Sequence, residues 1–282
     1  MLQDIPISQP RFTIITPNKN GERFLDQTIR SVLAQRNDGV DLEYIVLDGT
    51  STDGSMKIIE RYRNLIDVVI SEPDQGPAAA INKGLRLARG EILAWLNADD
   101  VYHPNTLTRV LKVMDPNPKA ALCFGSCRII DEQDREIRRP ITRFKELFFP
   151  LSSRFTIQSI NYISQPAMFF RRSALEQAGP LREDMKAAFD YDLTLRLWRH
   201  GGAVQAPGAP LADFRWHQSS ISGSHFQTQF REELQAAARD AGPLAPQTLI
   251  HHGVRWGIVG IYSVMARVRK QRAKDRAPRR PS

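Results

Sequence analysis

Short apolar runs alternate with segments of helical periodicity over the first 125 residues, and this alternation limits the fold more than any other feature. The runs of strand length are 11–16, 42–48, 66–71, 91–97 and 120–125. The helical segments that separate the first four are 22–35, 55–64 and 77–89. Apolar strands that alternate with helices of this length predict an α/β fold, in which a mostly parallel central sheet is flanked by helices on both faces.

Polar residues gather where four of these strands end. They lie at 16–20, 48–53, 72–75 and 97–100. Ligands of parallel α/β sheets bind at the carboxyl ends of the strands, so this edge is the expected site. The strand 91–97 is followed by two adjacent acids, Asp99 and Asp100, whose charges need a cation nearby. Because hard metals of the Mg/Mn type bind carboxylate and phosphate oxygens, the pair predicts chemistry on a nucleotide diphosphate.

The net charge of +8 comes almost wholly from the last 16 residues. Residues 267–282 hold eight Lys or Arg and one Asp, a charge of +7, which leaves +1 for everything before them. These basic residues are not interleaved with aromatic side chains, so nucleic acid is not the expected partner. Cys123 and Cys127 are too few for a zinc site and are expected to be buried thiols.

Five segments resemble, in order along residues 11–225, the motifs of glycosyltransferase family 2. They are FTIITPNKNGERFLDQTIRSVLAQ, EYIVLDGTSTDGS, SEPDQGPAAAINKGLRLARGEILAWLNADD, QPAMFFRRSALEQAGPL and FDYDLTLRLW. The resemblance implies a GT-A fold with a Rossmann-like sheet, and an inverting, metal-dependent enzyme that uses a nucleotide sugar. It divides the chain into a nucleotide-sugar-binding half, a mixed acceptor-binding half, a C-terminal helical segment and a basic, disordered tail. The boundaries are 1–125, 126–225, 226–270 and 271–282.

The resemblance assigns donor binding to the strand ends. Asp48 is expected to accept a hydrogen bond from the nucleobase of the donor, with Thr16 and Pro17 shaping the loop over the base. Asp74 lies where the family closes its donor site. Asp53 is interpreted as a helix cap, with at most a secondary role in binding.

Further assignments concern a helix and a loop. Asn82 and Lys83 are expected to open toward the same edge, where Lys83 either faces phosphate or is a solvated helix lysine. Gln165 and Pro166 resemble the family's acceptor-side loop. Arg171 is interpreted as a surface charge. The second half is also expected to hold a hairpin after residue 126, helices near 173–178 and 190–200, and a strand at 211–217.

The metal site is implied by the family's DxD region. Asp99 and Asp100 match its metal-binding acids, and the expected cofactor is Mn²⁺ or Mg²⁺, which would offset charge on the leaving diphosphate. Asn97 stands where many members have the first Asp of the motif, so it is expected beside the donor while metal affinity rests chiefly on Asp99. His217 matches a histidine that some relatives place near the metal; a structural histidine beside Trp216 is the alternative.

The catalytic assignment falls on Asp190, which matches the family's general base. Its role would be to remove the proton from an acceptor hydroxyl as that oxygen attacks the anomeric carbon. Asp192 lies about 200° further around the helix and is expected to pair with Arg196 one turn later. Phe189, which stands where many relatives have a glutamate, is expected to raise the pKa of Asp190 slightly.

The C-terminal segment has 11 uncharged residues between Arg255 and Arg267. A bilayer span needs about 20 residues, so this segment is too short to cross. It fits a helix in the membrane interface, followed by the basic tail on anionic lipid. A packed helix with a solvated tail is the alternative. Since the first residues lack a signal-peptide pattern, a cytoplasmic protein is expected, peripheral on the inner face of the membrane if the tail binds lipid.

These observations predict an inverting glycosyltransferase that moves a sugar from a nucleotide diphosphate, with UDP-sugar as the expected donor, to a hydroxyl of a glycan or glycolipid. The process would be cell-surface polysaccharide synthesis. Two alternatives stay open: a nucleotidyltransferase on a related sheet, and a non-catalytic nucleotide-sugar-binding module, which would tolerate loss of Asp99 and Asp190. A dinucleotide-binding oxidoreductase is not supported, because no G-x-G-x-x-G follows the first strand.

Overall fold

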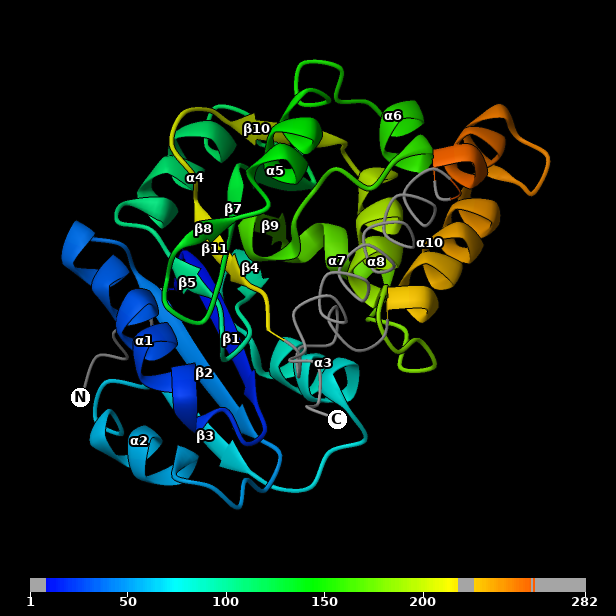
Figure 1. The fold of residues 1–282 in the computed structure, drawn as a ribbon. Coiled ribbons are helices and arrows are strands. Elements are labelled where there is room, and N and C mark those ends of the chain that lie inside the picture. The colour runs from blue at the N-terminus through cyan, green and yellow to red at the C-terminus, as the bar shows by residue number, and fades with distance from the viewer. Residues whose placement is uncertain (1–8, 218–225, 255, 257–282) are drawn as a thin grey trace, which may run out of the picture.

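A seven-stranded, mostly parallel sheet forms the centre of the molecule (Figure 1). The structure is a computed structural model that describes residues 9–217, 226–254 and 256. In sheet order the strands are β10 (Ala203–Ala206), β6 (Leu122–Gly125), β9 (Met168–Arg171), β4 (Ile92–Trp95), β1 (Phe12–Asn18), β2 (Leu42–Asp48) and β3 (Val68–Ser71). Only β9 runs antiparallel to its neighbours β4 and β6 among these described strands. The predicted α/β architecture is therefore confirmed.

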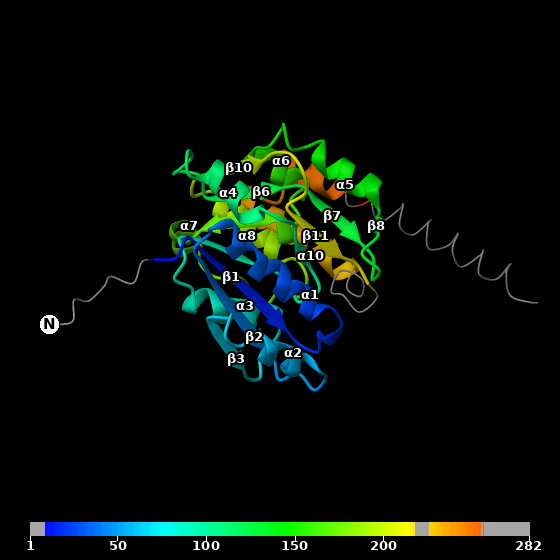
Figure 2. The ribbon, with the colours of Figure 1, turned by 90° about the vertical axis from the view of Figure 1, so that its left-hand side faces the viewer.

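Helices bury both faces of this sheet, as Figures 1 and 2 show. One face packs against α1 (Glu22–Leu33), α2 (Ser55–Arg61) and α4 (Thr106–Met114); a short 3₁₀ turn, η1 (Ala34–Asp38), follows α1. The other packs against α3 (Pro77–Leu87), α7 (Arg172–Ala178), α8 (Phe189–Trp198) and α10 (Phe226–Ala241). Along β2, Tyr44 and Val46 point to the first face, and Ile45 and Leu47 to the second. Successive side chains of a strand point to opposite faces, so a strand covered on both faces is apolar throughout.

A second, four-stranded sheet lies beside the central one. Its order is β5 (Val101–Tyr102), β11 (Ala212–Arg215), β7 (Cys127–Ile130) and β8 (Glu136–Ile137). β7 and β8 form the predicted hairpin, and β11 runs antiparallel to β5. Because β5 directly follows Asp99 and Asp100 while β11 leads to His217, this sheet brings the histidine to the end of β4.

Two short helices that the sequence pattern did not predict connect β8 to β9. They are α5 (Arg139–Glu146) and α6 (Arg154–Ser159), followed by the 3₁₀ turn η2 (Gln165–Ala167). α5 has a proline in its first turn, and the N-cap residue of α6 is Ser153, whose side chain accepts a hydrogen bond from the Thr156 N–H at 3.1 Å. Helices of eight and six residues contain too few turns to produce a clear apolar period. The proline at the start of α5 and the capping serine of α6 were the sequence features that could have indicated these helices.

Arg171 is buried, so its interpretation as a surface charge is wrong. Its guanidinium donates to the carbonyl oxygens of Ala120, at 3.1 Å, and Met114, at 2.8 Å, and forms an ion pair with Glu91. Backbone carbonyls at the end of α4 would otherwise be buried without donors. The arginine therefore closes the end of that helix against β9.

The C-terminal part begins with α10, and residues 246–254 are also helical. Most of the predicted interfacial segment and the whole basic tail lie outside the described residues. Within the described part of the chain, no helix has both the length and the apolar composition needed to span a membrane. Cys123 and Cys127 are buried free thiols, as predicted.

Candidate active site

A cavity of about 710 Å³ opens at the carboxyl ends of β1 and β4. Of the residues that the sequence assigned to donor or metal binding, Pro17, Asp74, Asn97, Asp99 and His217 line it. The other lining residues come from the end of β1, the loop after it, the starts of α1 and α3, and the ends of β4 and β11: Asn18, Lys19, Asn20, Gly21, Arg23, Phe24, Gly76, Pro77, Ala80, Ala98 and Phe214. The binding edge predicted for a parallel sheet therefore contains a cavity.

The adjacent acids Asp99 and Asp100 have different surroundings. The Oδ2 atom of Asp99 lies 2.9 Å from Nε2 of His217, and its side chain opens on the cavity. Asp100 is fully buried, and its oxygens accept hydrogen bonds from the Arg215 N–H, at 2.9 Å, and from Nδ2 of Asn97, at 3.1 Å. Burial, and then the neighbouring charge of Asp99, raise the pKa of Asp100 well above its usual value. Both oxygens of Asp100 bind protein donors and its side chain does not line the cavity, so the metal site proposed below rests on Asp99.

Arg215 supports the turn that carries these acids. Its side chain is fully buried, and Nε donates to the carbonyl of Asp99 at 2.9 Å. The other guanidinium nitrogens donate to the carbonyl of Asp131 in the β7–β8 turn and to the side chain of Gln27 on α1, each at 2.8 Å. One buried arginine thus joins the metal-side turn to a hairpin and a helix.

Asp48 is only 2% exposed and is held by protein donors. Its oxygens accept hydrogen bonds from Nδ2 of Asn18 at 2.7 Å, from the hydroxyl and N–H of Ser51 at 2.5 and 2.9 Å, and from the hydroxyl of Ser71 at 2.9 Å. Burial alone would raise the pKa of Asp48, but these hydrogen bonds outweigh it and lower the pKa. Contact with a nucleobase requires exchange of one of these bonds, so that role stays a prediction.

Three other residues assigned to the donor site use their polar groups within the protein. Thr16 is fully buried, and its hydroxyl lies 3.0 Å from the hydroxyl of a core tyrosine. Asn82 both donates to and accepts from the backbone of Leu181 at 2.9 Å, which ties α3 to the segment before α8. Lys83 forms an ion pair with Glu72. None of the three lines the cavity.

The loops after β2 and β3 approach each other at Gly49 and Asp74. A Cβ atom on Gly49 would lie 2.3 Å from Oδ2 of Asp74, so a larger residue there would require the Asp74 side chain to shift. Asp53 accepts hydrogen bonds from the N–H groups of Ser55, at 2.9 Å, and Glu22, at 3.0 Å. These are the first residues of α2 and α1, so the interpretation of Asp53 as a helix cap is confirmed.

The loop that the resemblance predicts on the acceptor side contacts the end of β4 through Gln165. Its Nε2 donates to the carbonyl of Trp95 at 2.7 Å, and its Oε1 accepts from Nδ2 of Asn97 at 3.2 Å. Pro166 is buried. Asn97 therefore joins the end of β4 to the loop that precedes β9.

Asp190 lies half-buried in the first turn of α8. Burial raises its pKa to about 6; the charge of Glu233 adds to the rise, and that of Lys145 opposes it. Glu233, on α10, accepts a hydrogen bond from Asn161 at 3.1 Å, and Lys145, on α5, donates to Ser164 at 3.1 Å. Burial also raises the pKa of Glu233 and lowers that of Lys145. Three helices thus bring two acids and one amine together.

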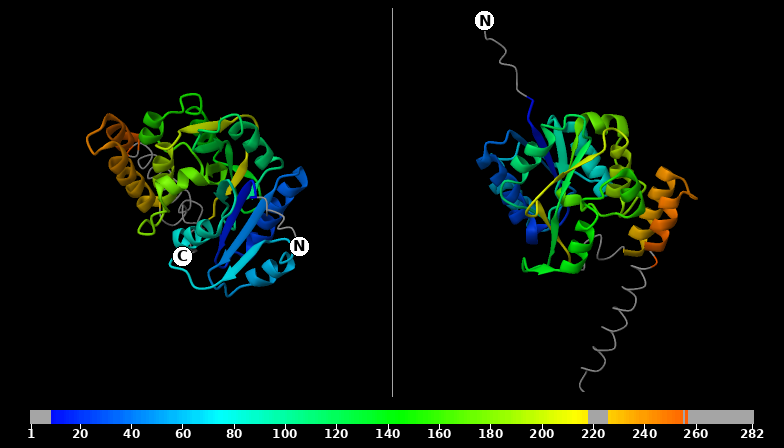
Figure 3. Two further views of the ribbon diagram at one scale, coloured as in Figure 1. Left: turned by 180° about the vertical axis from the view of Figure 1, so that it is seen from behind. Right: turned by 90° about the horizontal axis from the view of Figure 1, so that it is seen from above.

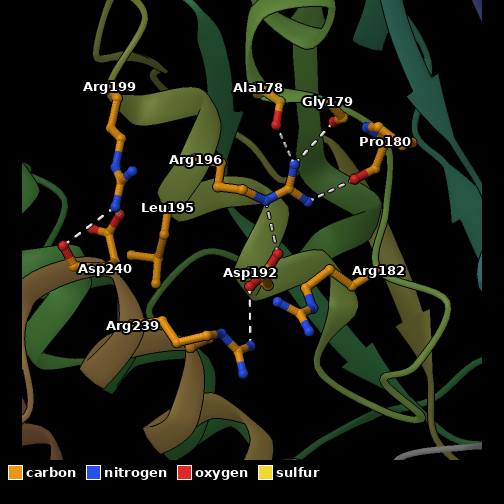
Figure 4. Close-up of a pocket in the computed structure, with 11 residues that line it drawn as sticks. Ala178, Gly179, Pro180, Arg182, Asp192, Leu195, Arg196, Arg199, Arg239 and Asp240 are labelled. Atoms are coloured by element: carbon orange, nitrogen blue, oxygen red, sulfur yellow. Dashed lines mark hydrogen bonds and ion pairs between the residues drawn. The ribbon is translucent and has the colours of Figure 1, made fainter.

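A group of ion pairs on the opposite side of α8 fastens it to α10. Asp192 accepts hydrogen bonds from Nε of Arg196 at 2.8 Å and from Arg239 at 3.1 Å, as Figure 4 shows. The predicted pairing of Asp192 with Arg196 is confirmed. Because Arg239 belongs to α10, this group also fixes the relative position of the helices that carry Asp190 and Glu233.

The cavity fits a metal ion carried with a diphosphate. Asp99 and His217 are both ligand types for Mn²⁺, and Oδ2 and Nε2 converge to 2.9 Å. Across the residues that the structure describes, no group of three or more His, Cys, Asp or Glu converges as a ready metal cluster. Two protein ligands, with the remainder from phosphate oxygens and water, match the way such ions are held at nucleotide sites.

Residues 13–179 match the family described as Glycosyl transferase family 2. The chain belongs to this family. A curated relative in Bacillus subtilis, the putative teichuronic acid biosynthesis glycosyltransferase TuaG, is 35% identical over 78% of this chain and 84% of its own length. Some other relatives are longer, and the chain spans about a third of their length. The protein is a glycosyltransferase, and the recognition from sequence is confirmed.

Solved structures place this glycosyltransferase in the GT-A fold. Staphylococcus aureus TarS 1–349 in complex with UDP-GlcNAc matches with a TM-score of 0.66 and 18% identity, over 84% of this chain and 67% of the other. The mannosyltransferase PcManGT from Pyrobaculum calidifontis, in complex with GDP-Man and Mn²⁺, matches with a TM-score of 0.63 and 18% identity, over 93% and 81%.

Sequence reasoning missed four charged residues of this region. Lys19 and Arg23 line the cavity, and their place directly after β1 was the available signal. Lys145 and Glu233 gave no sequence signal as neighbours of Asp190. They lie 45 residues before it and 43 residues after it, so only the packing of α5, α8 and α10 brings them together.

Proposed function

We propose that this glycosyltransferase moves a sugar from a nucleotide-diphosphate donor, with UDP-sugar as the expected donor, to a hydroxyl of a glycan or glycolipid, with inversion at the anomeric carbon. The observation that carries the proposal is the cavity at the strand ends with Asp99 and His217 paired on its wall. The presence of UDP-GlcNAc in the TarS complex supports the donor class.

The charge around the cavity suits a diphosphate. Gly76 and Pro77, at the start of α3, line it, and the positive end of a helix dipole attracts phosphate. Lys19 and Arg23 also line the cavity, and Arg23 pairs with Glu132 at 2.7 Å. Bound Mn²⁺ or Mg²⁺ would be held by Asp99 and would offset charge on the leaving diphosphate as a Lewis acid. His217 is the second proposed ligand, because its Nε2 atom lies 2.9 Å from Oδ2 of Asp99. Mn²⁺ in the PcManGT complex supports a divalent ion as the cofactor.

Asp190 is the proposed general base. With a pKa of about 6 it is mainly ionised near pH 7.5, yet basic enough to accept a proton in the transition state. As the acceptor oxygen attacks the anomeric carbon, its proton passes to the Asp190 carboxylate. The electron pair of the breaking carbon–oxygen bond leaves with the diphosphate. Attack from the side opposite the leaving group inverts the anomeric configuration.

The acceptor is proposed to be a polysaccharide or its lipid-linked precursor. The printed role of TuaG, teichuronic acid biosynthesis, supports cell-surface polysaccharide synthesis as the process. A cytoplasmic enzyme that binds the inner face of the membrane through its C-terminal segment stays part of the proposal. The basic residues of that segment begin at Arg255, beyond which the structure describes only residue 256.

Nucleotide-sugar turnover tests the proposal directly. A panel of UDP- and GDP-sugars is incubated with the protein, with and without Mn²⁺, and release of the nucleoside diphosphate is measured. We expect turnover by the wild type and by the control Asp38→Asn, which changes an exposed side chain. Turnover should be lost in Asp99→Asn and in Asp190→Asn. Failure of every donor to bind would overturn the proposal. Donor binding without turnover on any acceptor would instead favour the binding module.

A further inference from the structure

Exposed apolar side chains are concentrated in two segments of the molecule. Among the described residues ten large apolar side chains are exposed, and eight of them lie at 144–155 or 244–256. The eight are Phe144, Leu147, Leu151, Phe155, Leu244, Leu249, Ile250 and Trp256. Single exposed apolar residues are ordinary, but a concentration of this kind marks an interaction surface.

α6, which begins at the end of the first segment, lies beside the second. Nε2 of Gln247 donates to the side chain of Gln158 on α6 at 3.1 Å, and Nδ1 of His251 lies 3.1 Å from the Gln158 carbonyl. Arg154, at the start of α6, pairs with Asp240 of α10 at 3.3 Å. Figures 1 and 3 show α6 beside the orange C-terminal segment from opposite directions. We call the apolar face formed by 144–155 and 244–256 the α5–α6 surface.

The segment that carries α5 is also basic. Residues 138–155 contain five Lys or Arg and one Glu. The exposed side chains of Arg139 and Arg154 pair with Glu136 and Asp240, and Arg143 is a further exposed cation of α5. Apolar side chains flanked by cations are the combination that binds the interface of an anionic bilayer.

We propose that the α5–α6 surface binds a bilayer that contains anionic lipids. The chemistry favours lipid over a second copy of the chain, since two copies of this basic face would repel each other. The exposed Trp256 of this face is the last residue that the structure describes, and the last 16 residues of the sequence carry a charge of +7. This docking is independent of the proposed donor chemistry and goes beyond it.

Docking on this face would orient the enzyme for a lipid-linked acceptor. α5 exposes Phe144 and Leu147 to solvent, whereas Lys145 between them is charge-coupled to Asp190. The helix that touches lipid would therefore also border the proposed base. This consequence rests on the proposed function, whereas the docking itself does not.

A fluorescent probe on the surface tests the docking. Cys123 and Cys127 are buried, and burial raises the pKa of Cys123 to about 12, so both thiols react slowly. A polarity-sensitive dye is attached to Leu147→Cys and, as the matched control, to Leu87→Cys, an exposed position on α3. With phosphatidylcholine–phosphatidylglycerol vesicles we expect a blue shift at 147 and none at 87. Equal responses, or none at 147 while the protein co-sediments, would overturn the proposal.

Vesicle binding by the unlabelled protein gives a second measurement. The full-length double variant Leu147→Ser/Leu151→Ser is expected to need at least about tenfold more anionic lipid for half-maximal co-sedimentation, because two apolar side chains no longer enter the interface. The matched variant Leu65→Ser/Leu87→Ser should bind as the wild type. Unchanged binding by the first variant would mean that the tail alone holds lipid and would overturn the proposal. If the variant disrupts a dimer of the protein and still binds lipid as the wild type does, the proposal is overturned as well.

Failure of the docking is separable from failure of the transferase. Turnover of a nucleotide sugar with a water-soluble acceptor does not require lipid, so it should be equal in the wild type and in Leu147→Ser/Leu151→Ser. Loss of turnover in both proteins would count against the proposed function. Equal turnover with equal vesicle binding would count against the α5–α6 surface alone.

Discussion

The sheet edge that is proposed to bind the donor, called the donor edge, and the region around α8 both contain aspartates, but with opposite shifts in pKa. Burial would raise the pKa of Asp48, but hydrogen bonds from Asn18, Ser51 and Ser71 reverse the effect and keep it ionised. At Asp190 burial dominates, and the pKa rises to about 6. A carboxylate surrounded by donors holds a fixed charge, whereas one in a drier place can exchange a proton.

The two regions also differ in construction. The donor edge is assembled mainly from strand ends that lie within the first 100 residues, and β11 with the residues after it adds Phe214, Arg215 and His217. The region around Asp190 is assembled from α5, α8 and α10, which are separated by long stretches of chain. Binding of the donor and transfer of the proton are therefore expected to respond to different mutations.

The largest effect is expected from Asp190→Asn. Removal of the general base should lower the rate of transfer by about a hundredfold to ten-thousandfold, with donor affinity unchanged. Initial rates and calorimetric titration with donor measure the two quantities. Asp38→Asn, at an exposed position, is the control. Full activity in Asp190→Asn would remove the distinction between the two regions.

Asp99→Asn should separate the two adjacent acids at the donor edge. We expect roughly a hundredfold or greater loss of activity and the loss of stimulation by Mn²⁺, because a proposed metal ligand is removed. Asp100→Asn should keep the response to Mn²⁺, since its side chain is buried on protein partners. Titration of activity with Mn²⁺ measures both. The reverse pattern would show that the ligand is Asp100.

Arg215→Met should destabilise the donor edge as a whole. The substitution removes hydrogen bonds to Asp99, Asp131 and Gln27 and leaves buried carbonyl oxygens without donors. We expect the free energy of unfolding to fall by about 2–4 kcal/mol in chemical denaturation. Arg61→Met, whose side chain is 64% exposed in the wild type, should change it by less than about 0.5 kcal/mol. Similar losses in both variants would contradict the role given to Arg215.

The smallest effect is a displacement of the pH profile. Asp190 must be ionised to accept a proton, so kcat/KM should fall as the pH drops below about 6. Glu233→Gln removes a negative charge that raises the pKa of Asp190, so the acidic limb of the profile, where kcat/KM falls, should move to lower pH. Lys145→Met removes a positive charge that lowers it, and should move the limb to higher pH. Each displacement is expected to be less than about one pH unit.

Donor affinity measured over the same pH range is the control for these profiles, because Asp190 is not expected to contact the donor nucleotide. If kcat/KM and donor affinity fall together as the pH is lowered, the titrating group belongs to the donor edge and is not Asp190. Displacements in the same direction for both variants would contradict the charge coupling between α8, α5 and α10.

The features predicted best are those that depend on neighbours in sequence. The pairing of Asp192 with Arg196 follows from their spacing of one helical turn. The cap at Asp53 follows from its position before α2. The strands were predicted because a sheet covered on both faces requires continuous apolar runs. By contrast, α5 and α6 are too short to show a period, and their exposed apolar residues are not distinguishable in sequence from buried ones.

The sequence by itself determined the α/β fold, the family and the edge of the sheet where the donor is proposed to bind, because hydrophobic period and strand-end motifs are local patterns. Only the tertiary structure separated Asp99, which faces the cavity, from Asp100, which is buried. It also brought Glu233 and Lys145 to Asp190. Burial and charge coupling depend on what packs around a side chain, and that packing joins segments which are far apart in the chain.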